Sequence, residues 1–335
     1  MNTKRVVALI VAAVLLFFSI GINTIITIFK TDFFSSFDSM LGEPVTYESV
    51  IESGELSNRI AHLTVNGVIQ DVGEPSIWET VEYNHQAFMD QLDAVLVDET
   101  VKAVLLSVNS PGGGVIESAE IHEKLVQIKE EKQIPIYVSM GSMAASGGYY
   151  IAAPADKIFA QRETITGSIG VIMQSLNYSK LAEKVGIEYE TIKSGEHKDM
   201  FGGTRPSTPD ELAMLQEMID ESYEQFVDII EEGRNMSEVD VKKVADGRIL
   251  GGTQAMKAGL VDEIGNEKVA LDTLRAEQGL EEAQVFEYAA ESDSWASLLG
   301  VKVGSMFSPS AETQAISKII SSTSSPRMMY LYGEQ

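Results

Sequence analysis

The chain has 335 residues, and 25 Lys and Arg against 50 Asp and Glu give it a net charge of −25. Such an acidic surface repels nucleic acid and anionic lipid headgroups, so neither is expected as a partner. The chain has no cysteine, which excludes disulfides and thiol catalysis, and no spacing typical of metal ligands is present. We therefore expect neither a metal nor a cofactor.

The amino-terminal segment predicts a membrane anchor. Residues 6–29 are uncharged, with Lys4 and Arg5 before them and Lys30 after them. About 20 apolar residues span a bilayer, and a cleaved signal peptide, the alternative, has a core of only about 7 to 15. We expect residues 1–30 to be a cytoplasmic stub and a transmembrane anchor. Residues 31–58 have six acidic and no basic side chains, so we expect this linker and the rest of the chain outside the cytoplasmic membrane.

Residues 59–295 alternate strand-like and helical patterns, which predicts one large α/β domain. Strands are expected at 60–69, 103–108, 134–140, 157–160, 188–192 and 284–288, and helices at 115–132, 149–153, 212–233, 236–246, 253–258 and 266–278. The longest helix has a predicted capping box, formed by Thr208 and Glu211 around Pro209. Met214 and Met218 are four residues apart on this helix, and we expect both in the core.

Ser146 is a candidate nucleophile. It lies among small residues, 141–148, directly after the apolar run 134–140. A serine between a strand and a helix presents its hydroxyl at the carboxyl edge of a parallel sheet, and the neighbouring glycines leave room for a peptide. The alternative is a helix packed closely through small residues.

A glycine-rich turn at residues 110–114 connects the strand 103–108 to the helix 115–132. Its amides point to the same sheet edge, where acyl transfer needs donors for an oxyanion. A phosphate-binding loop is the competing interpretation, but the turn lacks the Lys-Ser/Thr of a P-loop and the full dinucleotide fingerprint. Ordinary turn glycines are the other alternative.

A serine nucleophile also needs a base, and the four histidines offer no evident triad. His85 and His122 lie in polar, Glu-rich helical sequence and are expected on the surface. His62 lies in a predicted strand. His197 is harder to dismiss, but its neighbour Lys198 is a second candidate base.

Four motifs, at residues 110–114, 141–148, 166–171 and 194–198, resemble in order and spacing the bacterial signal peptide peptidase A family of membrane-anchored serine proteases. The resemblance covers roughly residues 59–280. It implies the fold of the Clp protease and crotonase superfamily and a Ser-Lys dyad, with Ser146 as nucleophile and Lys198 as general base. It further implies that Ser168 orients the lysine amine, and that the amides of Gly113 and Gly147 form the oxyanion hole.

The resemblance also implies a substrate class and an assembly. Apolar peptides, in particular remnant signal peptides, are the expected substrates. A lysine works as a base near neutral pH only where its charge is disfavoured, so we expect Lys198 to be buried. Because the family also has double-length members, a single-domain chain is expected to form a homo-oligomer with its active sites at or near protomer interfaces.

Residues 296–335 are expected to be a flexible tail. Its apolar segment 328–332 could bind the active site of the same or a neighbouring protomer as a product-like peptide, and a docked terminal helix is the alternative. Two other functions stay open at this point. One is a crotonase-like acyl-CoA hydratase or isomerase, against which the anchor and Lys198 argue, and the other is a non-catalytic membrane scaffold.

Overall fold

The computed structural model describes residues 47–73, 83–289 and 327–333. The predicted anchor at residues 6–29 lies outside these residues. Within the described part of the chain, no helix is both long enough and apolar enough to cross a membrane.

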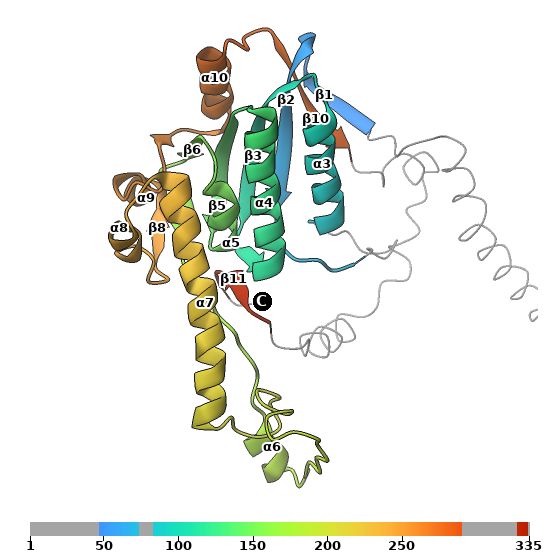
Figure 1. The fold of residues 1–335 in the computed structure, drawn as a ribbon, viewed down its shortest axis with the longest axis vertical. Coiled ribbons are helices and arrows are strands. Elements are labelled where there is room, and N and C mark those ends of the chain that lie inside the picture. The colour runs from blue at the N-terminus through green and yellow to red at the C-terminus, as the bar shows by residue number, and fades with distance from the viewer. Residues whose placement is uncertain (1–46, 74–82, 290–326, 334–335) are drawn as a thin grey trace, which may run out of the picture. The chain divides into compact units, whose positions relative to one another are not determined.

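A mostly parallel sheet forms the centre of the structure (Figure 1), which agrees with the predicted α/β class. Its strands follow the order β1-β10-β2-β3-β5-β6-β9, and β7 and β8 extend it beside β5. Neighbours from β10 through β9 are parallel, and β1 pairs antiparallel with β10 at one edge. The strand bounds are β1 (Tyr47–Glu52), β2 (Glu55–Asn66), β3 (Val101–Ser110), β5 (Ile136–Ala145), β6 (Lys157–Ala160), β7 (Ile165–Gly167), β8 (Ile249–Gly251), β9 (Glu263–Ile264) and β10 (Ala283–Ala289).

Helices cover both faces of this sheet because β3 alternates between two apolar sets. Val104 and Leu106 belong to a core shared with α3 (His85–Val97), α4 (Val115–Lys132) and α5 (Gly147–Ala152). Ala103 and Leu105 belong to a second core shared with α10 (Glu267–Gln278). A strand that is apolar on both sides is typical of a parallel sheet with helices on its two faces.

A long extension leaves this body (Figure 1). Helix α7 (Pro209–Arg234) runs from the body to α6 (Ser179–Lys184), and we call residues 172–208 the extension. The predicted capping box of α7 is confirmed, since Glu211 N–H donates to Thr208 Oγ1 while the Glu211 carboxylate accepts from Thr208 N–H. Two short helices, α8 (Glu238–Lys242) and α9 (Gly252–Lys257), follow.

Some sequence predictions differ from the structure. The expected strand at 188–192 is not one, because these residues belong to the extension and pair with no sheet strand. Strand β1 and the start of β2 occupy the second half of the predicted linker, where Glu48 forms an ion pair with Arg59 at 2.5 Å. Met214 and Met218 are 42% and 43% exposed, so the prediction that they lie in the core is wrong for a single protomer.

Candidate active site

Ser146 lies at the junction of β5 and α5, as the N-cap residue of α5. Its backbone has φ +54° and ψ −117°, a conformation that costs energy for any residue other than glycine. The side chain is 1% exposed, and its Oγ has no hydrogen-bond partner among the described residues. A strained strand-to-helix turn that leaves a serine hydroxyl unpaired is typical of hydrolase nucleophiles.

Ser168 lies next to Ser146. Strand β7 is parallel to β5, with Gly167 paired to Ala145, and Ser146 N–H donates to the Gly167 carbonyl at 2.8 Å. Ser168 follows directly, is 8% exposed and has φ +51°. The structure therefore brings these two predicted site residues together.

The amides of Gly113 and Gly147 converge on a point beside Ser146. Gly113 belongs to β4 (Gly112–Gly114), which leads from β3 into α4. A Cβ atom placed on Gly147 would lie 3.1 Å from both the Gly113 nitrogen and the carbonyl oxygen of Tyr330. A Cβ on Gly112 would lie 2.6 Å from the Gly147 nitrogen and 2.0 Å from the same oxygen. Only glycine leaves this space open to a carbonyl group.

That carbonyl belongs to β11 (Met329–Leu331), which Figure 1 shows in red beside α4 and α5. Strand β11 pairs antiparallel with β4, and Tyr330 lies opposite Gly113. On its other edge, Met329 exchanges two main-chain hydrogen bonds with Ile172, at 2.9 and 3.0 Å. The main chain thus holds this segment on both edges, as it would hold an extended peptide.

The Tyr330 side chain fills a closed aromatic pocket. It is fully buried, with ring centroids 4.8 Å from Tyr150 and 4.7 Å from Phe226. Its hydroxyl donates to the Ser222 carbonyl at 3.0 Å. The pocket therefore accommodates a large aromatic residue with a polar tip. No local pattern in the sequence indicated these pocket residues, although Tyr150 lies only four positions after Ser146.

The structure does not bring Lys198 to Ser146 within one protomer. Lys198 is exposed and lies in the extension. The next residue, Asp199, accepts a hydrogen bond from Arg205, which also donates to Glu211 in the first turn of α7. Phe226, which packs on Tyr330, lies farther along the same helix. At 1.5 Å per residue, Glu211 and Phe226 are about 22 Å apart. The expected burial of Lys198 is therefore absent from the single protomer.

Arg205 organises the charges around this segment. Its Nη2 contacts Asp199 Oδ1 and Glu211 Oε1, each at 2.6 Å. Hydrogen bonds from Arg205 lower the pKa of Glu211 to about 2, and hydrogen bonds from Arg205 and Lys193 lower the pKa of Asp199 well below its ordinary value. Asp199 is therefore paired with Arg205 and Lys193.

Two histidines differ from the sequence prediction. His85 is buried between the Tyr83 hydroxyl at 2.8 Å and Glu120 at 2.7 Å, because α3 packs on α4. His122 packs edge-on against Tyr150, and burial lowers its pKa to about 4. The expected surface position of His85 was therefore wrong, and His122 is half-buried rather than fully solvated. His197 lies 3.5 Å from Glu211, in the extension.

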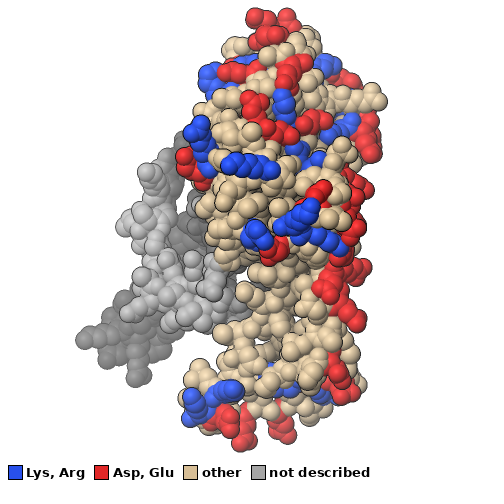
Figure 2. Space-filling view, turned by 90° about the vertical axis from the view of Figure 1, so that its left-hand side faces the viewer, with Lys and Arg blue, Asp and Glu red and all other residues tan. Residues whose placement is uncertain are grey.

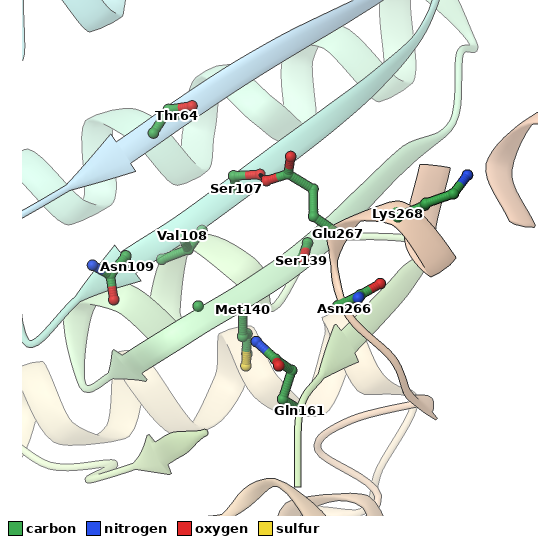
Figure 3. Close-up of a pocket in the computed structure, with 11 residues that line it drawn as sticks. Thr64, Ser107, Val108, Asn109, Ser139, Met140, Gln161, Asn266, Glu267 and Lys268 are labelled. Carbon is green, nitrogen blue, oxygen red and sulfur yellow. Dashed lines mark hydrogen bonds between the residues drawn. The ribbon is translucent and has the colours of Figure 1, made fainter. Parts of the chain in front are cut away.

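A cavity of about 390 Å³ opens on another part of the sheet (Figure 3), and none of the predicted site residues lines it. At its wall the Ser107 hydroxyl donates to Glu267, and His62 Nε2 lies 3.0 Å from Ser107 Oγ. In a catalytic triad the carboxylate instead holds the second ring nitrogen of the histidine. Here His62 Nδ1 has no partner within the described structure, so this cluster connects α10 to the sheet without activating the serine.

Residues 128–281 match the family model Peptidase family S49. The chain is 42% identical over 350 residues to "Putative signal peptide peptidase SppA" of Enterococcus faecium, covering 99% of each chain. It is 34% identical to Protease 4 of Haemophilus influenzae, over 70% of this chain and 37% of that protein. It is also 32% identical to the chloroplastic serine protease SPPA of Arabidopsis thaliana, over 62% of this chain and 31% of that protein.

These similarities, on an α/β fold with a buried serine at a strand-to-helix turn, define a serine protease. The chain belongs to peptidase family S49, and it is a serine endopeptidase of the signal peptide peptidase type. The crotonase-like and scaffold alternatives are thereby set aside.

Proposed function

We propose that Ser146 is the nucleophile of this peptidase and that the amides of Gly113 and Gly147 bind the oxyanion. The observation that carries this proposal is the position of the Tyr330 carbonyl. In the antiparallel ladder Tyr332 N–H donates to the Pro111 carbonyl, and hydrogen-bonded pairs recur at every second residue. The Tyr330 carbonyl therefore faces the Gly113 amide, as the carbonyl of a scissile bond would.

Lys198 is the proposed general base, supplied by a neighbouring protomer. Within one chain Lys198 lies far from Ser146 and is exposed. A second copy of the chain is therefore needed to complete the dyad and to bury the amine. Ser168 is adjacent to Ser146, at a suitable position to accept a hydrogen bond from this amine. A ring-like homo-oligomer and the fold shared with Clp protease and crotonase are part of the same proposal.

The extension supports self-association. Figure 2 shows charged side chains over much of the body, whereas on this face the part between the body and the tip of the extension is largely uncharged, apart from acidic side chains along one side. Six of its large apolar side chains are 50% to 97% exposed, more than an isolated protein usually leaves to water. These side chains are Leu176, Leu181, Val185, Ile187, Tyr189 and Ile192. We infer that they pack against neighbouring protomers in a homo-oligomer.

The proposed reaction is an acyl transfer in two halves. Lys198 accepts the proton of Ser146 as Oγ attacks the scissile carbonyl, and the amides of Gly113 and Gly147 stabilise the resulting oxyanion. Lys198 then gives the proton to the leaving amine, which releases the carboxyl-terminal product. A water molecule, activated by the same lysine, hydrolyses the acyl-enzyme and restores Ser146. No metal or cofactor has a role in this scheme.

The expected substrates are extended apolar peptides, such as remnant signal peptides. Support comes from the two-edged strand pairing of β11 and from the aromatic pocket of Tyr330. We call the space between β4 and Ile172, which β11 occupies, the groove. In this proposal the tail is a product-like ligand of the groove, which substrates must displace. The anchor at residues 6–29 would hold the catalytic domain at the outer face of the cytoplasmic membrane.

Peptide hydrolysis tests the nucleophile. The full chain in detergent is incubated with an apolar peptide that contains tyrosine, beside Ser146→Ala and the matched control Ser142→Ala. Ser142 is in the same small-residue segment, and its hydroxyl donates to Asn109. We expect hydrolysis by the wild type and by Ser142→Ala only. Equal activity of Ser146→Ala would refute the assignment.

A further inference from the structure

Arg327 anchors the segment that leads into β11. It lies three residues before Tyr330, the residue whose carbonyl faces the proposed oxyanion hole. Its Nη1 contacts Glu117 Oε1 at 3.3 Å, and its Nη2 donates to Gln70 Oε1 at 2.7 Å. The tail therefore makes a charged contact, between Arg327 and Glu117, outside the aromatic pocket that holds Tyr330.

Glu117 is built into the groove. It lies in the first turn of α4, directly after β4, and its side chain is 11% exposed. Its Oε1 accepts the Asp71 amide at 3.1 Å, which fixes the carboxylate. A Cβ on Gly114 would lie 1.8 Å from Glu117 Oε2, so the glycine leaves room for this carboxylate.

The surroundings of Glu117 favour a cation. Burial raises the pKa of the Tyr83 hydroxyl, and the negative charges of Glu117, Glu120 and Asp71 raise it further. Within the described residues, Arg327 is the cation paired with Glu117. A buried carboxylate with acidic neighbours is stabilised when a positive side chain enters.

We propose that Glu117 and Gln70 form a subsite that selects arginine or lysine at the fourth residue before the cleaved bond. This inference rests on the proposed function, in which Tyr330 occupies the place of the residue that supplies the scissile carbonyl. The selected peptide has one basic residue followed by apolar residues. Signal peptides begin with a basic region followed by an apolar run, so the subsite directs cleavage to the boundary between them.

The test compares two blocked fluorogenic peptides that copy residues 327–332. One carries arginine at its first position, and the other carries citrulline, which has nearly the same shape but no charge. The tail of the enzyme competes with both peptides equally, so the ratio of their kcat/KM values is independent of it. We expect wild-type enzyme to prefer the arginine peptide about tenfold, as suits a partly exposed charge-assisted pair.

Glu117→Gln keeps the side-chain volume and the acceptor for Asp71 but removes the charge, so the ratio should fall close to one. Glu130→Gln makes the same change at an exposed position of α4 and should keep the wild-type ratio. If Glu117→Gln fails to fold, Gln70→Ala replaces it, with an expected decrease in the ratio of about threefold.

The outcomes distinguish a failure of the subsite proposal from a failure of the proposed function. Equal cleavage of both peptides by the wild type, or a full preference retained in the folded variants, overturns the subsite and leaves the proposed function intact. Cleavage that survives Ser146→Ala, or cleavage of neither peptide, contradicts the proposed function itself.

Discussion

The surroundings of Ser146 and those of Lys198 differ in almost every physical respect. Around Ser146, residues 147–153 are buried and the sheet supplies a rigid support. Around Lys198 most side chains are exposed, and the charge network of Arg205 connects the segment only to the start of α7. Ser146 is thus buried within its own protomer, whereas Lys198 needs a neighbouring protomer to bury it. Activity should therefore depend on assembly.

The largest expected effect comes from removing either residue of the proposed dyad. Ser146→Ala and Lys198→Ala should each lower kcat/KM by more than about a thousandfold, because nucleophile and base act as one unit. The exposed Lys184→Ala, also in the extension, should retain activity.

Mixing the two inactive variants sharpens this comparison. If each site combines Ser146 of one protomer with Lys198 of another, random co-assembly restores about a quarter of the sites. Co-expression and peptide hydrolysis measure the recovery. Mixed oligomers of normal size that remain inactive would mean that one chain supplies both residues.

The next effect concerns assembly alone. Ile192 is 97% exposed in the extension, and a charge there should disfavour its burial against a neighbour. We expect Ile192→Asp to reduce oligomer mass and to lower activity at least about tenfold, with little change in the melting temperature of the body. Val97→Asp, at a 75% exposed position on α3, is the matched control. Light scattering and hydrolysis check both. Full activity of a dissociated Ile192→Asp protein would show that activity does not require assembly.

A smaller effect is expected at the groove. Removal of the residues after Pro326 frees the aromatic pocket, and a tethered ligand has an effective concentration of about a millimolar, so kcat/KM for short peptides should rise severalfold. Mass spectrometry of stored protein gives an independent readout. Active enzyme should lose its tail, and intact Ser146→Ala protein should keep it. Unchanged kinetics, with tails equally intact in both proteins, would exclude a product-like role.

The smallest effect is a difference in acid stability between the body and the extension. Burial lowers the pKa of His122 to about 4, so the unfolded chain binds its proton first as the pH falls below about 6.5. The body should lose roughly 1 to 3 kcal/mol of unfolding free energy between pH 6.5 and 4. His122→Gln should remove this dependence. Urea titrations at both pH values measure it, and an equal slope in the variant would assign the effect to another group.

The extension should respond at lower pH. Glu211 and Asp199 have depressed pKa values, so their pairing with Arg205 is complete above the ordinary carboxyl range and is lost as the pH falls from about 4.5 towards 2. Hydrogen exchange should therefore show the extension intact at pH 5, where His122 already weakens the body. Arg205→Ala should loosen the extension at every pH.

Local features of the sequence predicted much of the body. Helix α4 has the predicted bounds, and the capping box of α7 forms as expected, because both depend on residues within a few positions of each other. The turn at Ser146 follows similarly from an apolar run that ends in small residues. The four motifs also indicated the family, since their spacing preserves the strands and turns that place them.

The tertiary structure alone decided what depends on contacts between distant segments. Residues 188–192 are β-like in composition but lie where no sheet strand reaches them, and His85 is buried only because α3 packs on α4. The aromatic pocket combines Tyr150 with Phe226, and β11 pairs with β4 from the other end of the chain. Neither the separation of Lys198 from Ser146 nor the contact of Arg327 with Glu117 could be predicted from local patterns. Such patterns indicate which residues can form an element, whereas pairing into a sheet, burial and charge pairing depend on which segments meet in space.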